Sequence, residues 1–251
     1  MQFSKRVVQL GLAVALTLSS SLAMAADKVL IVVTSHSQMG NIGEKTGYWL
    51  GEVTHPYHEL IKAGIEVDIA SIAGGKAPVD ERSLAEADQV NQWFMADNIH
   101  SNKLQQTLKL ADLKAADYQA VLFAGGHGTM WDFPQDQVLQ QFAATLYQNN
   151  GIVAAVCHGP AALLNITLTD GSYLISGKEV TGFSNSEEEQ IKLTQVVPFS
   201  LQNELVKRGA SYNAADNWQS KVVVDQRVVT GQNPQSATAV GAALVKLLTA
   251  N

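Results

Sequence analysis

An uninterrupted apolar run, Ile152 to Val156, ends at Cys157, the only cysteine among the 251 residues. His158, Gly159 and Pro160 follow it, and then an alanine- and leucine-rich stretch. This pattern predicts a buried strand that turns sharply into a helix and presents the thiol at the turn. Backbone N–H groups and the dipole at a helix N-terminus would favour the thiolate. The adjoining imidazole favours a nucleophile over the alternative, a buried structural thiol.

The rest of the chain alternates strand-like and helix-like segments. Near-continuous apolar runs are typical of strands buried on both faces, and they alternate here with amphipathic helical segments. The predicted strands cover 28–34, 66–72, 117–124, 152–156, 178–183, 222–225 and 227–230, and the predicted helices cover 46–63, 135–148 and 236–248. Pro56 predicts a kink or a second helix start, and Gly64 a helix end. The alternation predicts an α/β fold with a mostly parallel sheet covered by helices on both faces.

The N-terminus has the pattern of a secretory signal peptide. Lys5 and Arg6 precede a short apolar stretch, residues 7–18, and a serine run leads to Ala23-Met24-Ala25. We expect cleavage after Ala25, which leaves a single domain of residues 26–251 in the periplasm. The apolar stretch is too short for a membrane span, and no later segment approaches the roughly eighteen apolar residues that a span needs, so we expect no membrane partner.

Composition narrows the classes of function. The formal net charge is −6 and no Lys/Arg cluster is present, which argues against a nucleic-acid partner. A single cysteine cannot form an internal disulfide, so in an exported protein it is incidental, intermolecular or reactive. His55 and His58 lie three apart, but a hydrogen-bonded pair is favoured over a metal site there. We expect no metal and no cofactor.

Polar residues follow several predicted strands. Ser35-His36, Gly125-Gly126-His127 and Cys157-His158 each come directly after a strand. Ligands of parallel sheets gather at the carboxyl ends of the strands, so we expect these residues at one edge. Residues 77–116 are longer than a plain crossover needs, and we expect them to form an inserted helical flap near that edge.

Residues 154–160, Ala-Ala-Val-Cys-His-Gly-Pro, resemble the nucleophile elbow of the ThiJ/PfpI superfamily, whose members have a class I glutamine amidotransferase-like, flavodoxin-like fold. Further similar blocks are residues 46–57, 125–134, 180–187 and 230–236. The resemblance therefore runs from Lys28 to the C-terminus. Within the superfamily the chain is most similar to the branch of heat-shock chaperones and glutathione-independent glyoxalases, called glyoxalase III.

This resemblance implies conversion of methylglyoxal, a small aldehyde, to lactate through a hemithioacetal on Cys157. Cys157 would be the nucleophile, His158 the general base and Glu187 the residue that orients it. Glu52 would be a carboxylic acid that hydrogen-bonds the thiol, with a pKa raised by desolvation and like charge. From the residues alone, Glu187 is predicted to lie in the solvated first turn of a helix. Glu44 is an alternative to Glu52 for the carboxyl group beside the thiol.

The same resemblance implies an oxyanion hole made by the backbone N–H groups of Gly126, His127 and His158. Tyr48, Trp49, Trp131 and Phe133 are expected to wall the substrate pocket, although aromatic residues in such places are more often core. Superfamily members are frequently dimers, which allows a homodimer here.

Two other functions stay open. One is a thiol peptidase or amidase of the same superfamily, and the other is a holding chaperone or protein-repair factor. The bulky residues of 128–134 favour a closed pocket and hence a small substrate. Proteins of this branch are mostly cytoplasmic, whereas this protein is expected to be exported. A carbonyl compound other than methylglyoxal therefore stays open as its substrate.

Overall fold

The computed structural model describes residues 27–85 and 87–250. The predicted signal peptide, residues 1–25, lies outside this described part, and so export stays a prediction. Within the described ranges, no helix has the length and apolar character needed to cross a membrane.

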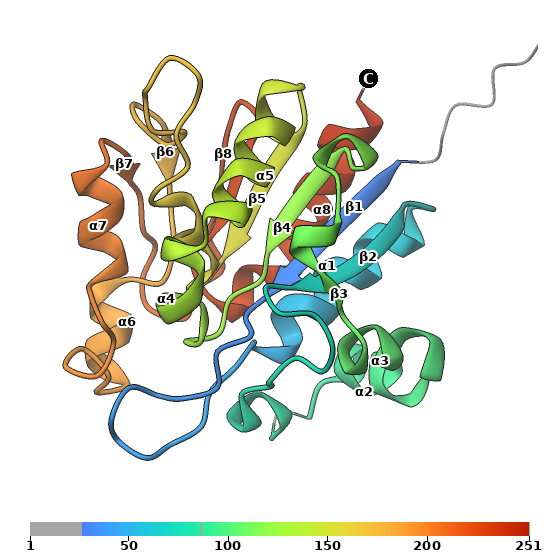
Figure 1. The fold of residues 1–251 in the computed structure, drawn as a ribbon. Coiled ribbons are helices and arrows are strands. Elements are labelled where there is room, and N and C mark those ends of the chain that lie inside the picture. The colour runs from blue at the N-terminus through green and yellow to red at the C-terminus, as the bar shows by residue number, and fades with distance from the viewer. Residues whose placement is uncertain (1–26, 86, 251) are drawn as a thin grey trace, which may run out of the picture.

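A mostly parallel sheet forms the centre of the molecule (Figure 1), as the alternation of segments predicts. Its order is β3-β2-β1-β4-β5-β9-β8, and every neighbouring pair is parallel except β8 with β9. The bounds are β1 Lys28–Val33, β2 Glu66–Ser71, β3 Leu108–Lys109, β4 Ala120–Phe123, β5 Ile152–Val156, β8 Val222–Asp225 and β9 Val228–Gly231. The central strands β4 and β5 are buried along their whole length, because helices cover both of their faces.

Helices form a layer on each side of this sheet (Figure 1). Helices α1 (Leu50–Lys62) and α8 (Ala237–Thr249) pack together on one face, and α5 (Gln137–Gln148) covers the other with the short α4 (Thr129–Asp132). This arrangement confirms the predicted flavodoxin-like α/β fold.

Helix α1 begins four residues later than the sequence predicts. Residues 46–49 are extended instead, because the N–H groups of Tyr48 and Trp49 donate to Pro78 and Gly125. Pro56 lies inside α1 without ending it. Gly64 ends the helix as predicted: its φ is +80°, and its N–H donates to the carbonyl of Ile61.

Two other segments differ from the sequence prediction. The predicted strand 178–183 shrinks to β6 (Glu179–Val180), which pairs with β7 (Ser211–Tyr212) outside the main sheet. Between them lie α6 (Asn185–Gln190) and α7 (Leu201–Lys207). The stretch after the cysteine forms a 3₁₀ helix, Gly159–Leu163, rather than an α-helix, since short helical segments often take this tighter geometry.

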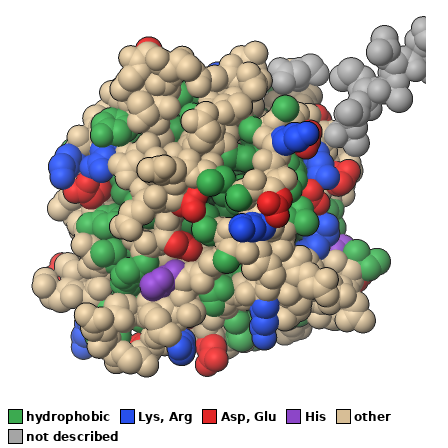
Figure 2. Space-filling model, viewed as in Figure 1, with side chains coloured by type: hydrophobic (Ala, Val, Ile, Leu, Met, Phe, Trp, Pro, Cys, Tyr) green, Lys and Arg blue, Asp and Glu red, His purple; other side chains and the backbone are tan. Residues whose placement is uncertain are grey.

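The segment 77–116, predicted to be a helical insertion, is largely helical but also contributes β3 to the main sheet. It holds a 3₁₀ turn (Glu81–Leu84) and two helices, α2 (Gln89–Ala96) and α3 (Asn98–Gln105), and short 3₁₀ turns follow β3 at Leu110–Asp112 and Ala115–Asp117. Asp88 and Asp97 cap α2 and α3 through their side chains. The face shown in Figure 2 carries charges of both signs, interspersed among apolar side chains.

Replacing Gly126 with alanine tests how tightly the chain is packed at the end of β4. The φ of Gly126 is +96°, and a Cβ there would lie 2.3 Å from the carbonyl oxygen of Gly47. Gly171 has a similar φ of +84° but no atom within 4 Å of its Cβ position. We expect Gly171→Ala to cost about 1–2 kcal/mol of unfolding free energy. Gly126→Ala should cost about 1–3 kcal/mol more, because the added carbon overpacks the site. Equal losses in urea unfolding would show that the close approach is unimportant.

Candidate active site

Cys157 stands at a sharp turn at the end of β5, as the sequence predicts. Its φ is +60°, in the left-handed region that residues other than glycine rarely adopt. Its N–H donates to the carbonyl of Gly231 at 2.9 Å, and its own carbonyl accepts from the N–H of Phe183 at 2.8 Å. These two backbone hydrogen bonds fix the turn and therefore the position of the sulfur.

The thiol of Cys157 lies between an imidazole and a carboxyl group. Its Sγ is 3.4 Å from Nδ1 of His158, and it is hydrogen-bonded to the side chain of Glu52. Burial, and after it the charge of Glu52, raises the pKa of the Cys157 thiol well above its usual range, and the backbone N–H of His158 only partly offsets this. Burial and Glu52 thus oppose the thiolate that a helix N-terminus would favour, and the helix that follows Cys157 is short.

Glu52 reaches the thiol from the first turn of α1. The side chain is fully buried, and its Oε2 accepts a hydrogen bond from the N–H of Gly125 at 2.9 Å. Two acidic groups in contact in a buried site favour one shared proton over two negative charges. The structure thus brings Glu52 to the predicted place. Its rival Glu44 instead acts on Arg82, because its charge helps to raise the pKa of that guanidinium.

The carboxylate that contacts His158 belongs to Glu188. The prediction that Glu187 orients His158 was therefore wrong. Oε2 of Glu188 lies 2.8 Å from Nε2 of His158. Because a carboxylate only accepts, Nε2 carries the proton, and Nδ1 is left unprotonated toward the sulfur of Cys157. This arrangement allows His158 to take a proton on the side that faces the reacting atoms.

Glu187 instead holds α6 in place. Its carboxylate accepts from the N–H and hydroxyl of Ser184, from the N–H of Trp218 and from the side-chain amide of Asn233. Ser184 and Glu187 together form a capping box at the start of α6. The pattern Ser-x-x-Glu signals this motif in the sequence, and it would have assigned Glu187 to the cap and left Glu188 for the site.

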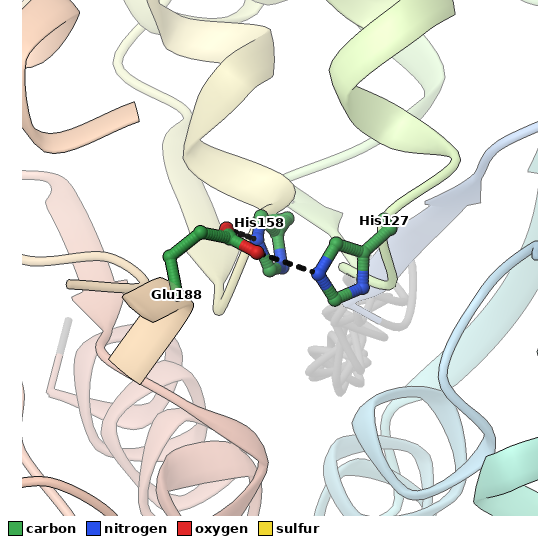
Figure 3. A group of neighbouring side chains, drawn as sticks. All are labelled: His127, His158 and Glu188. Carbon is green, nitrogen blue, oxygen red and sulfur yellow. Dashed lines mark hydrogen bonds and ion pairs between the residues drawn. The ribbon is translucent and has the colours of Figure 1, made fainter. Parts of the chain in front are cut away.

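The side chain of His127 completes the group around Glu188 (Figure 3). Its Nε2 lies 3.1 Å from Oε1 of Glu188, and its ring centre is 4.0 Å from that of His158. Burial, followed by the nearby His158, lowers the pKa of His127 to about 4. Although burial alone opposes ionisation of Glu188, the two imidazoles hold its pKa well below its usual range. One ionised carboxylate therefore accepts from two rings.

This cluster also has the composition of a cation site. Ligand atoms of His127, His158 and Glu188 all lie within 4.8 Å of one another, close enough for them to hold a divalent cation. The sequence does not predict this group, since its members come from three distant segments. In the structure both imidazoles donate to the carboxylate, so these side chains already satisfy one another's hydrogen bonds.

The predicted oxyanion-hole residues lie at the wall of a cavity of about 320 Å³, together with Cys157 and His158. Among the described residues, no group accepts a hydrogen bond from the backbone N–H of Gly126 or of His127. Both N–H groups are therefore available to a ligand, and their role as oxyanion donors stays a prediction.

The aromatic walls of this cavity match the expectation only in part. The expected Trp49 lines it together with Phe183 and Trp218, whereas Tyr48, Trp131 and Phe133 do not. Tyr48 is buried, and successive side chains of extended backbone point to opposite sides, which places its neighbour Trp49 at the cavity. Trp131 stacks on His36 at 5.1 Å instead.

Separate substitutions of the two adjacent glutamates test this assignment. Glu188→Gln removes the charge that orients His158, and we expect alkylation of Cys157 by iodoacetamide at pH 7 to slow at least about tenfold. Glu187→Gln disturbs the cap of α6, and we expect it to cost about 1–3 kcal/mol of unfolding free energy. That variant should leave alkylation within about twofold of the wild-type rate. The reverse pattern would restore Glu187 to the site.

The lowered pKa of His127 gives a pH dependence of stability. As pH falls from about 6.5 to about 4, the unfolded chain binds a proton at His127 that the folded chain does not. The free energy of unfolding should therefore fall by about 3 kcal/mol over this window. His127→Gln should make that fall smaller in urea titrations at several pH values. An unchanged slope would contradict the assignment of a neutral, buried His127.

Comparisons with known proteins show which family this chain is similar to. Residues 45–247 match the model of the DJ-1/PfpI family. A glutathione-independent glyoxalase of Saccharomyces cerevisiae is 36% identical over 225 residues, covering 85% of this chain and 94% of that protein.

Two solved structures are similar in both sequence and fold. Glyoxalase III from Candida albicans is 32% identical with a TM-score of 0.82, covering 87% of this chain and 96% of that one. A Francisella tularensis protein named Rapid Encystment Protein 24 kDa is 48% identical with a TM-score of 0.86, covering 88% and 99%. The resemblance found in the sequence is thereby confirmed, and the chain belongs to the DJ-1/PfpI family.

Proposed function

We propose that this protein is a glutathione-independent glyoxalase that converts methylglyoxal to lactate through a hemithioacetal on Cys157. The observation that carries the proposal is the contact of one buried thiol with a carboxyl group, Glu52, and an imidazole, His158. Relatives that match nearly their whole length bear the name glutathione-independent glyoxalase or glyoxalase III.

The first step is addition of the sulfur to the aldehyde carbon. The S–C bond forms as the carbonyl π bond breaks, and the thiol proton leaves to Glu52. Glu52 can take this proton during the attack because it is hydrogen-bonded to the thiol. The N–H groups of Gly126 and His127 then stabilise the charge on the oxygen, and each donor contributes about 3 kcal/mol in comparable sites.

The second step moves hydrogen between the two carbons of the substrate. Nδ1 of His158 takes the proton from the carbon bonded to sulfur while the neighbouring ketone oxygen takes the proton held by Glu52, which gives an enediolate. Glu188 stabilises the ring while it is positively charged, since Oε2 accepts from Nε2 at 2.8 Å. Return of the proton to the neighbouring carbon gives a thioester of lactate, which water cleaves to release the thiol and the acid.

The cavity supports a small substrate better than a peptide. Its volume of about 320 Å³ and its walls of Trp49, Phe183 and Trp218 suit a few-atom carbonyl compound. A thiol peptidase would need an open cleft beside Cys157, and nothing in the cavity favours that alternative. Export to the periplasm rests on residues 1–25 of the sequence alone.

Lactate formation from methylglyoxal by the purified, fully reduced protein tests the proposal directly. In the absence of glutathione, we expect turnover that Cys157→Ala abolishes. Glu52→Gln should lower it about a hundredfold or more, since it removes the group that accepts the thiol proton. Thermal unfolding of both variants controls for misfolding. An inactive reduced wild-type protein would overturn the proposal, and peptidase and holding-chaperone assays would follow.

A further inference from the structure

One cation, Arg82, lies at the wall of the cavity and has no role in the proposed mechanism. Arg82 comes from the inserted segment 77–116 and lines the same cavity as Cys157. Its Nε and Nη2 donate to the two carboxylate oxygens of Asp80 at 2.8 and 2.6 Å. Asp80 is fully buried and also accepts from the hydroxyl of Thr46 at 2.9 Å. The guanidinium is therefore held in a fixed orientation.

The other terminal nitrogen of Arg82, Nη1, has no such acceptor among the described residues. Nη2 also lies 3.4 Å from Nδ1 of His127, but among the described residues no acceptor is hydrogen-bonded to Nη1. Two N–H groups of the guanidinium thus have no acceptor in the described part of the protein, and Arg82 borders the cavity with a side chain that is 43% exposed. Glu44 and Glu188 also act on the charge of Arg82, so a ligand would be recognised by short hydrogen bonds more than by a long-range field.

We propose that Arg82 selects aldehydes that carry a second oxygen on the adjacent carbon, by donating from its guanidinium to that oxygen; this inference rests on the proposed function. When the backbone N–H groups of Gly126 and His127 hold the aldehyde oxygen, the neighbouring oxygen needs a donor of its own. That oxygen gains negative charge in the enediolate step, and a guanidinium stabilises such charge. Arg82 is in this sense a specificity-determining residue.

The inference predicts an order of binding. A carboxylate beside the aldehyde, as in glyoxylate, carries a full charge and should gain most from Arg82. Methylglyoxal, with a ketone oxygen, should gain less, and propanal, without a second oxygen, should gain nothing. Each compound can still add to Cys157, because addition needs only the aldehyde.

Protection of Cys157 from iodoacetamide, followed by mass spectrometry, measures this binding without any turnover. For each aldehyde, the concentration that halves the alkylation rate is compared between proteins, so hydration of the aldehyde in solution cancels. Arg82→Met would leave Asp80 buried without its ion partner, so the test variant combines it with Asp80→Asn. Asp80→Asn alone is the matched control that keeps the arginine.

We expect the double variant to bind glyoxylate about ten- to a hundredfold more weakly, while propanal changes less than about twofold. Asp80→Asn alone keeps the cation and one acceptor oxygen to orient it, so it should weaken glyoxylate binding less than the double variant does. Equal weakening for both aldehydes would show a structural role for Arg82 and overturn the inference alone. No protection of wild-type Cys157 by any aldehyde would overturn the proposed function and this inference with it.

Discussion

The site depends on the backbone at Cys157, which is held at a φ of +60° at the end of a fully buried strand. Such a conformation costs about 1–3 kcal/mol in a residue other than glycine. Hydrogen bonds to Gly231 and from Phe183 offset this cost, because they join the turn to β9 and to the segment before α6. If the turn relaxed, the sulfur would lose its contacts with both Glu52 and His158.

Two buried carboxyl groups, those of Glu188 and Glu52, have different electrostatic roles around this turn. Glu188 accepts from two imidazoles, and so negative charge is favoured there at neutral pH. Glu52 accepts from the N–H of Gly125 and is hydrogen-bonded to the thiol. One environment fixes a charge, and in the proposed mechanism the other moves a proton, which is a common division between paired carboxyl groups in enzymes.

Much of this arrangement can be read from the sequence, because it follows local patterns. The apolar run of β5 matches its predicted bounds, and Glu52 follows from the resemblance of residues 46–57. Glu187 and Glu188 could not be told apart by type, since one step along a helix start turns a side chain by about 100°. The capping box with Ser184 decides between them, and that signal is local as well.

Residues that long-range packing brings to the site carry no such signal. Arg82 lies in a 3₁₀ turn without apolar periodicity, and Trp218 lies in a loop about sixty residues beyond the cysteine in the chain. Trp218 reaches the cavity because its N–H donates to Glu187, which in turn caps α6. The proposed nucleophile and base thus come from a strand end that the fold itself dictates. Arg82 and Trp218 at the cavity wall come from a turn and a loop, where sequence can change without disturbing the sheet.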